Sequence, residues 1–358
     1  MGDILHALPA VAALRRAHPE WRIGWVVDPR WAPLLTAGNW AKKIGNRTSA
    51  GIAGYGIQTM ERGPEMPVVD WLHLAQTREW KKRPLSPATA GDIAALRREL
   101  RAAKYQAVLD LQGTIRSAAI ARLSGCQRRI GEAQPREWPA RLLFTEQVTT
   151  HGAHVIEQDL ELASAVAGDA LAAERPPLPV DREAESWCDN WLAETFAGRE
   201  RPIALLVPGA GWGAKRWPAE RYAVVARGLA TRGMHVAVNS GPGELPLVAE
   251  IVSSGVAVPL VASLPQLIAL TRRVALCIGG DTGPLHLACA LGRSVVGIYG
   301  PTDPSRNGPY GTRMRVLRNP ESRRDHTRRE APEAGLLTIQ PEEVLSAADE
   351  LLVEEERR

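Results

Sequence analysis

The sequence has few aromatic residues and few cysteines, and each shortage argues against a class of protein. Only 5% of the 358 residues are aromatic, and no stretch alternates basic with aromatic side chains. Proteins that bind single-stranded nucleic acid stack bases on such aromatics, so we expect no nucleic-acid partner. The four cysteines, Cys126, Cys188, Cys277 and Cys289, include no close pair. We therefore expect reduced core thiols of a cytoplasmic protein, without disulfides or a metal site.

Long apolar runs and a dinucleotide-binding glycine pattern are also missing. No stretch approaches the roughly 20 apolar residues needed to span a bilayer, and no signal-peptide pattern precedes the first helical pattern. Any membrane contact is therefore expected to be peripheral. No G-x-G-x-x-G follows a strand pattern with an acidic residue downstream. This disfavours a dinucleotide-dependent oxidoreductase.

The net charge is only +4, but the basic residues are clustered. The clusters occupy residues 80–83, 97–98, 128–129 and 313–329. Solvated helix faces and loops are the ordinary explanation for such clusters. The alternative is a surface for an anionic partner, such as a phosphorylated glycolipid or a membrane face.

The most informative segment is residues 279–286, Gly-Gly-Asp-Thr-Gly-Pro-Leu-His, which follows the apolar run 274–278. A strand that ends in glycines and passes into a proline-bearing helix start is typical of a phosphate site. The backbone can approach the ligand there, and the first N–H groups of the helix point at the anion. Thr282 is placed to cap this helix, which we expect to end at Gly292. The pattern predicts a sugar nucleotide or another phosphate ligand.

Strand and helix patterns alternate along the chain, which predicts an α/β fold with parallel sheets and crossover helices. Residues 41–69 have weak periodicity and receive no assignment. The proline-rich stretch after residue 173 is the best linker signal. Two α/β halves joined in this way suggest a ligand cleft between them. The expected divisions are an N-terminal domain over 1–173, a linker over 174–182, a C-terminal domain over 183–340 and a terminal helix over 341–358.

The start of the chain lacks an element that this fold class requires. Met1, Gly2 and Asp3 lead directly into a helical pattern, whereas such a domain should open with an apolar strand. We expect that the first N-terminal strand is missing from the sequence because its start is truncated or misassigned. The alternative is that the strand is truly absent.

Three segments together resemble the lipopolysaccharide heptosyltransferases of glycosyltransferase family 9. They are residues 1–9 (MGDILHALP), residues 208–218 (PGAGWGAKRWP), and residues 281–287 with 299–304 (DTGPLHL with YGPTDP). Within that family, residues 77–82 and 134–137 look most like heptosyltransferase I. The loop that begins at residue 208 is at least as similar to heptosyltransferase II.

The resemblance implies a GT-B fold, in which two Rossmann-like domains face each other across a cleft. It implies inverting transfer of heptose from ADP-L-glycero-β-D-manno-heptose, without a metal or other cofactor, to Kdo of a Kdo-lipid A acceptor. It also implies work at the cytoplasmic face of the inner membrane, with the C-terminal helix packing back on the N-terminal domain. A non-catalytic sugar-nucleotide-binding relative remains the alternative.

Two residues match the catalytic positions of the family. Asp3 matches the base that deprotonates the acceptor hydroxyl, and its place in a first helical turn favours the ionised form. An ordinary first-turn aspartate is the competing interpretation. Lys215 matches the residue that neutralises the departing diphosphate. A solvated loop lysine, or the neighbouring Arg216 in this role, is the alternative.

The segment that starts at residue 281 is expected to hold the donor. Asp281 would accept hydrogen bonds from sugar hydroxyls, while the backbone of Thr282 and Gly283 would hold the phosphates. A simple N-cap aspartate is the alternative for Asp281. His286, one turn further on, either faces the same site or packs within its helix.

Glu244 and Gly2 complete the expected donor site. Glu244 follows a strand and matches the family residue that binds the ribose hydroxyls, although a surface glutamate in a turn is a serious competitor. Gly2 belongs to the donor-contacting turn.

Three further residues match positions that contact the acceptor in the family: Arg78, Arg136 and His154. Kdo carries a carboxylate and lipid A carries phosphates, and both suit the arginine fork. The basic run 81–83 beside Arg78 could add attraction to an anionic leaflet.

Overall fold

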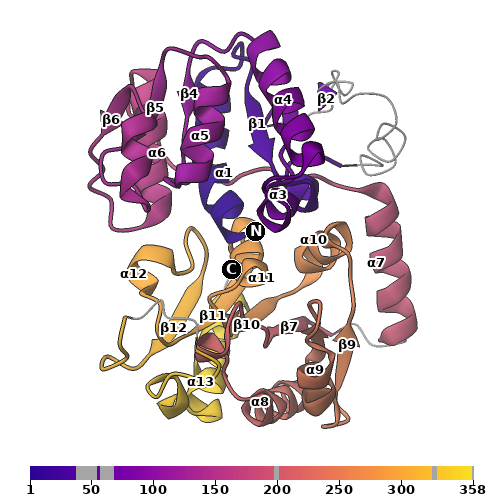
Figure 1. Ribbon diagram of the computed structural model, residues 1–358. Helices are drawn as coiled ribbons and strands as arrows, with labels where there is room; N and C mark the ends of the chain where they lie inside the picture. Colours follow the sequence, from indigo (N-terminus) through magenta and orange to yellow (C-terminus); the bar gives the residue numbers. More distant parts are fainter. Residues whose placement is uncertain (38–54, 57–67, 197–200, 325–328, 357–358) are drawn as a thin grey trace. The chain divides into compact units, whose positions relative to one another are not determined.

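The computed structural model describes residues 1–37, 55–56, 68–196, 201–324 and 329–356. The chain divides into two compact units between Pro179 and Val180 (Figure 1). This division falls inside the segment 174–182 that the sequence marks as a linker. Most of the unassigned stretch 41–69 lies outside the described residues.

The N-terminal unit carries two three-stranded sheets among its described residues. The first has the order β1 (Gly24–Val27), β3 (Trp71–Leu74), β2 (Tyr55–Gly56), with β1 parallel and β2 antiparallel to β3. The second is parallel, in the order β4 (Val108–Leu109), β5 (Arg129–Glu132), β6 (Glu146–Val148). A Rossmann-like domain would carry one continuous sheet. This unit differs because none of its described strands pairs with both β1 and β4.

Helix α1 (Gly2–Ala17) begins where the helical pattern predicted it. Its residues from Leu5 to Arg15 are buried on all sides, which is the behaviour of a core helix. Asp3 in the first turn and Arg16 in the last complement the helix dipole. The other helices of this unit are η1 (Pro29–Leu34), α3 (Thr77–Lys82), α4 (Pro87–Ala102), α5 (Ile115–Leu123), η2 (Trp138–Leu143) and α6 (Val155–Ala167).

The C-terminal unit is built on one parallel six-stranded sheet, as the alternating pattern predicted. The chain starts in the middle of this sheet, builds outward to one edge, and then returns to build the other half. This is the doubly wound arrangement. The strand order is β12 (Met314–Arg318), β11 (Ser294–Tyr299), β10 (Leu276–Gly280), β7 (Ile203–Val207), β8 (His235–Asn239), β9 (Ala257–Leu260).

Apolar residues on one face of this sheet form the main core. Alternate strand residues such as Leu206, Val236 and Ile278 pack there against Val225 and Leu229 of the helix α8 (Ala219–Thr231). Side chains of a strand alternate between its two faces, so helices on the other side cover the remaining residues. The helices of this unit are α7 (Arg182–Thr195), η3 (Gly213–Lys215), α8 (Ala219–Thr231), α9 (Leu245–Val252), α10 (Leu264–Arg273), α11 (Gly283–Ala290), α12 (Pro304–Asn307), η4 (Leu336–Thr338) and α13 (Pro341–Glu356).

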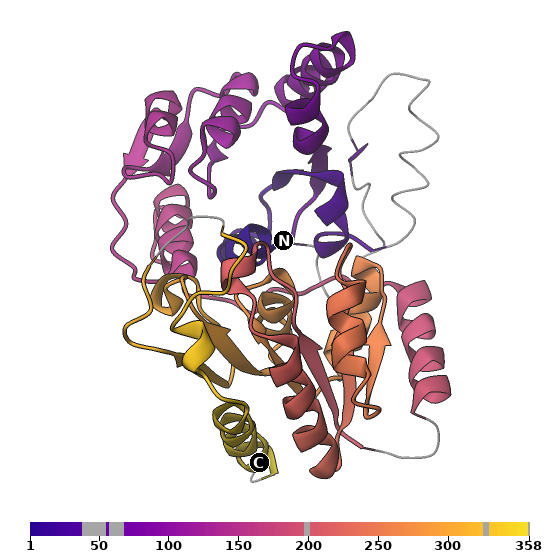
Figure 2. The ribbon, with the colours of Figure 1, turned by 60° about the horizontal axis from the view of Figure 1, so that its bottom comes forward.

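The C-terminal helix α13 lies beside α8 and near β11 and β12 (Figures 1 and 2). Its residues Val344, Ala347, Ala348 and Leu351 are buried in the core of the C-terminal unit. Packing of this helix on the N-terminal domain, which the resemblance implies, stays a prediction.

Candidate functional site

The loops at the carboxyl ends of β7 and β10 meet at the point where the strand connections reverse. Ligands of open α/β sheets bind at this switch point. The pairing of Val207 with Gly279 brings the two strand ends level. Lys215 lies in the loop after β7, and Asp281 directly follows β10. Two of the expected site residues therefore meet although 66 positions separate them in the sequence.

Lys215 and Asp281 form an ion pair at this switch point, because the ammonium Nζ donates a hydrogen bond to Oδ2 of the carboxylate. Their side chains are only 9% and 13% exposed. The Lys215 Nζ also lies 4.2 Å from the ring centroid of Trp212, whose π face attracts a cation. The neighbouring Arg216 is exposed. The structure therefore turns Lys215 inward.

His286 of α11 supplies the other partner of Asp281. Its Nε2 lies 3.0 Å from Asp281 Oδ1, so both carboxylate oxygens are hydrogen-bonded. Burial alone would raise the pKa of the Asp281 carboxyl. The hydrogen bond and charge of His286, with the charge of Lys215, outweigh burial and hold that pKa well below its ordinary value. Asp281 is thus an ionised anchor between two cationic or donating groups.

The turn after Asp281 leaves backbone donors facing the same edge. Thr282 is the N-cap residue of α11, as predicted, but its side chain does not cap the helix. Its hydroxyl donates instead to the carbonyl oxygen of Gly280 at 3.2 Å. The side-chain part of the capping prediction is therefore wrong. The first N–H groups of α11, from Gly283 onward, are left uncapped by this side chain, which suits them to an anion.

Glu244 lies against the loop that follows β7. Its Oε2 accepts a hydrogen bond from the Gly241 N–H at 2.7 Å. A Cβ atom placed on Gly209 would lie only 2.0 Å from Glu244 Oε1, so glycine is what allows the carboxylate to approach this backbone. Glu244 stands after β8, the second strand of the doubly wound unit. In the dinucleotide-binding version of this fold, an acidic residue at the corresponding place binds a ribose.

Asp3 is exposed in the first turn of α1, and its Oδ2 accepts a hydrogen bond from Gln112 Nε2 at 3.3 Å. Gln112 is itself positioned by Asp110, whose Oδ1 accepts from the N–H groups of Gln112 and Gly113, both at 2.9 Å. Neither Asp110 nor Gln112 was singled out from the sequence. The signal available was a polar turn at the carboxyl end of β4.

The expected acceptor residues have different surroundings. Arg78 in α3 and Arg136 after β5 are both exposed. His154 is buried, and its Nδ1 accepts a hydrogen bond from the Ile156 N–H at 3.2 Å, which makes it the N-cap of α6. Because Nδ1 is an acceptor, the ring proton of neutral His154 lies on Nε2. His154 therefore has a structural role as a helix cap, and its contact with the acceptor stays a prediction. Gly2 is the first residue of α1.

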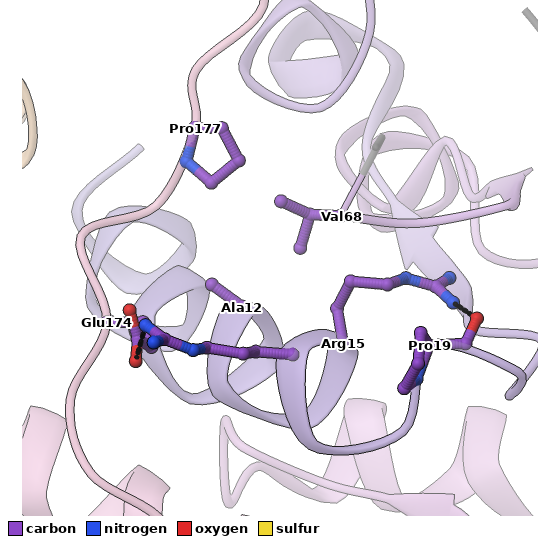
Figure 3. Close-up of a pocket in the computed structure, with 7 residues that line it drawn as sticks. Ala12, Arg15, Pro19, Val68, Glu174 and Pro177 are labelled. Carbon is purple, nitrogen blue, oxygen red and sulfur yellow. Dashed lines mark hydrogen bonds and ion pairs between the residues drawn. The ribbon is translucent and has the colours of Figure 1, made fainter. Parts of the chain in front are cut away.

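A cavity of about 340 Å³ lies elsewhere in the N-terminal unit, against the end of α1 (Figure 3). Arg16 donates to Glu174 at 2.6 Å at one side, and Arg15 donates to the carbonyl oxygen of Pro19 at 3.1 Å (Figure 3). Its lining residues are Ala12, Arg15, Arg16, Pro19, Val68, Glu174 and Pro177. It contains none of the expected site residues.

Within the part of the chain that the structure describes, no group of three or more His, Cys, Asp or Glu side chains is arranged to hold a metal ion. Across the same residues, no helix is both long and apolar enough to cross a bilayer. The four cysteines are free and buried.

The fold is that of an α/β protein with a doubly wound sheet, and the cluster of Lys215, Asp281 and His286 lies at the switch point where such sheets bind ligands. The chain belongs to glycosyltransferase family 9 (heptosyltransferase), whose family model matches residues 93–336. Membership confirms the resemblance seen in the sequence and makes the chain a glycosyltransferase.

The chain is also similar to individual heptosyltransferases. Lipopolysaccharide heptosyltransferase 1 of Escherichia coli K12 is 28% identical over 327 residues, which cover 89% of this chain and 91% of that protein. Lipopolysaccharide heptosyltransferase 2 of the same strain is 31% identical over 193 residues, 51% of this chain and 55% of that protein. The solved structure of E. coli heptosyltransferase WaaC with ADP has a TM-score of 0.71 at 22% identity, covering 99% of this chain and 96% of that one. This similarity confirms the α/β fold with parallel sheets over nearly the whole chain.

Proposed function

We propose that this chain is heptosyltransferase I, an inverting enzyme that moves L-glycero-D-manno-heptose from ADP-heptose to Kdo of the lipopolysaccharide inner core. The observation that carries the proposal is the cluster of Lys215, Asp281 and His286 at the switch point. It places a buried cation next to a glycine-rich helix start, which is the chemistry a nucleoside diphosphate requires. The similarity to heptosyltransferase 1 over 89% of the chain favours this member of the family.

In this proposal the C-terminal unit holds the donor. The diphosphate binds the first N–H groups of α11, at Thr282 and Gly283, and the ribose hydroxyls bind Glu244. Lys215 neutralises the negative charge that grows on the diphosphate as the bond to the sugar breaks. An ammonium group has three donors, so Lys215 can keep its bond to Asp281 and still reach a phosphate oxygen. Asp281 and His286 also offer hydrogen-bonding groups to the sugar hydroxyls.

Asp3 is the proposed general base. Its carboxylate takes the proton from the acceptor hydroxyl, and the acceptor oxygen forms a bond to the anomeric carbon. The bond between that carbon and the diphosphate oxygen breaks, which releases ADP and inverts the anomeric configuration. The exposure of Asp3 and the hydrogen bond from Gln112 support this role, because a base must be accessible and oriented.

Arginines of the N-terminal unit are proposed to bind the acceptor. Arg78 and Arg136 are exposed, and a guanidinium pairs in bidentate fashion with a carboxylate or a phosphate, as found on Kdo and lipid A. His154 would assist from its capping position. We also propose that the two units are Rossmann-like domains in a GT-B arrangement. The enzyme then works at the cytoplasmic face of the inner membrane.

The runner-up is heptosyltransferase II, which the 31% identity over 193 residues favours. The two are separated by acceptor. The purified chain is incubated with ADP-heptose and either Kdo-lipid A or the same acceptor already carrying its first heptose, and ADP release is followed. Release with Kdo-lipid A supports heptosyltransferase I, and release only with the heptosylated acceptor supports heptosyltransferase II. Donor binding by calorimetry without release from either acceptor would indicate a non-catalytic relative.

A further inference from the structure

A bidentate ion pair lies at the carboxyl end of β1, and the proposed reaction assigns it no role. Arg30 donates from Nε to Asp28 Oδ1 at 2.8 Å and from Nη2 to Asp28 Oδ2 at 3.0 Å. Asp28 also accepts from the Arg30 backbone N–H at 3.1 Å, which makes it the N-cap of η1. Burial would raise the pKa of the Asp28 carboxyl, but the hydrogen bonds from Arg30 outweigh burial and lower that pKa. The carboxylate is therefore ionised and holds the guanidinium in one orientation.

The Arg30 guanidinium is fixed on one side and open on the other. The Asp28 side chain is only 12% exposed, whereas that of Arg30 is 47% exposed. The guanidinium carbon lies 5.4 Å from the centroid of the Trp31 ring, which attracts the cation as well. A guanidinium has more N–H donors than one carboxylate can occupy. The Nη1 group of Arg30 donates to no atom of the residues that the structure describes, so this arginine is oriented and still able to bind a second anion.

The ion pair lies beside residues that the proposed reaction does use. Asp28 directly follows β1, and ligands of parallel sheets bind at the carboxyl ends of the strands. The backbone amide of Arg78 interacts with the Asp28 carboxylate, so the pair is next to the start of α3. The charges of the pair and of Asp3 all act on Met1, the residue before α1. The N-terminal unit thus groups Arg30 with the proposed base and with a proposed acceptor residue.

The surroundings of Arg30 carry an excess of positive charge. Residues 78–83 contain four basic residues and one acidic residue, Glu79. Glu79 accepts a hydrogen bond from Lys82 at 2.8 Å, and Asp28 balances Arg30 itself. The remaining basic side chains therefore favour the approach of an anionic group.

We propose that Arg30 binds an anionic group of the acceptor, a carboxylate or a phosphate, and that Asp28 positions Arg30 for this contact. Oxygens of either group accept hydrogen bonds from a guanidinium. The inference rests on the proposed function, because it concerns the acceptor of that reaction. The competing explanation is a local ion pair that only shapes the loop after β1, and it predicts no effect on the acceptor.

The first test is ADP release over a range of acceptor concentrations. In Arg30→Ala the acceptor KM should rise by roughly tenfold or more while the donor KM stays unchanged, because the lost hydrogen bond concerns the acceptor alone. Arg30→Lys should recover only part of this loss, since an ammonium lacks the fork. Arg22→Ala is the matched control. Arg22 is also exposed and its guanidinium carbon lies 5.7 Å from the Trp71 centroid, but it lies before β1 instead of after it, and its removal should leave the acceptor KM unchanged.

The positioning role of Asp28 has its own test. Asp28→Asn removes the charge that orients Arg30 and should raise the acceptor KM by roughly a few-fold. In an Arg30→Ala background the same substitution should add nothing, because a positioning residue acts only through the group that it positions. Equal effects in the two backgrounds would contradict this role. Urea unfolding of each variant controls for a loss of folded protein.

Two altered acceptors identify the anion. If Arg30 binds the Kdo carboxylate, the effect of Arg30→Ala persists after the lipid A phosphates are removed and disappears when the carboxylate is converted to its methyl ester. A phosphate partner gives the reverse result. The proposal is overturned by an unchanged acceptor KM in Arg30→Ala, by an equal rise in Arg22→Ala, or by an effect that persists with both altered acceptors.

Acceptor binding separates this inference from the proposed function. If the original chain releases no ADP, the proposed function fails, and calorimetry with deacylated Kdo-lipid A then decides the role of Arg30 without turnover. Weaker binding by Arg30→Ala than by Arg22→Ala supports that role. No binding by the original chain, or equal binding by the two variants, overturns it.

Discussion

Lys215 donates a hydrogen bond to Asp281 at the one place in the C-terminal sheet where the strand connections reverse direction. The pair joins the loop after the first strand of the unit to the turn after the fourth. In the proposed mechanism this lysine is held in position before the ligand arrives, so little reorganisation is needed when charge develops on the diphosphate.

Replacing Lys215 by alanine should lower kcat by about 100-fold or more, because one preorganised cation at a developing oxyanion is worth that much. Lys215→Arg should recover only part of the rate, since a planar fork does not fit the place of a compact ammonium. Steady-state ADP release measures both. Arg216→Ala is the matched control, because that neighbour is exposed, and it should stay within a few-fold of the original rate. A larger effect for Arg216 would reverse the assignment.

Replacing Asp281 by asparagine should destabilise the C-terminal unit as well as lower activity. The substitution leaves the Lys215 ammonium buried without its counter-charge, and such losses amount to about 3–5 kcal/mol. Urea unfolding at neutral pH measures the change. Asp349→Asn serves as the control, because the Asp349 pair with Arg232 is largely exposed and should contribute less than about 1 kcal/mol.

The stabilisation by Asp281 should depend on pH in a defined direction. The folded protein depresses the pKa of this carboxyl, so its contribution is fully present above the unfolded-state pKa of about 3.9. It is lost as the pH falls below that value toward the lower folded-state pKa. The stability difference between the original chain and Asp281→Asn should therefore be constant from pH 5 to pH 7. It should shrink below about pH 4, and a difference that grew on acidification would contradict the ion pair.

Replacing Glu244 by alanine should raise KM for the donor and leave kcat nearly unchanged, because ribose contacts are the same in the ground and transition states. Loss of a hydrogen bond to a charged group is worth about 1.5–3 kcal/mol, or roughly 10- to 150-fold in donor affinity. Calorimetry with ADP measures it directly. Glu220→Ala, at the exposed start of α8, provides the control and should bind ADP normally. If Glu244→Ala and Glu220→Ala bound ADP with equal affinity, Glu244 would not be a donor-binding residue.

Replacing Gln112 by leucine should lower kcat by about tenfold while donor KM stays constant, because the hydrogen bond to Asp3 orients the base without touching the donor. Gln112→Asn tests whether a shorter amide restores part of the rate. Gln106→Leu, an exposed glutamine near the start of β4, is the control. A similar loss in Gln106→Leu would show a general effect on folding.

The C-terminal unit was largely predictable because its strands and helices are long enough to show their periods. The sequence pattern predicts a strand over 235–239 and helices over 245–252 and 264–270, and the structure has these elements at or close to those residues. Strand β9 was missed because it has four residues and contains Pro259, which removes a ladder donor. Short strands carry too little pattern to separate from loops.

The site was predictable only in part. The glycine-rich turns predict a phosphate ligand. The pairing of Lys215 with Asp281 could not be predicted in the same way, because it depends on the order of the strands, which no local pattern contains. The capping role of His154 was hidden because histidine is not among the preferred N-cap residues. The contact of Gln112 with Asp3 joins residues 109 positions apart, so it too lies beyond any local pattern.

The most direct test of the account is ADP release from ADP-heptose in the presence of Kdo-lipid A, by the original chain and by Asp3→Asn. The account predicts turnover with heptosylated acceptor as product for the original chain. It predicts loss of turnover in Asp3→Asn, with ADP-heptose binding retained by calorimetry. Full turnover by Asp3→Asn, or donor binding without ADP release by the original chain, would contradict the proposed transfer mechanism.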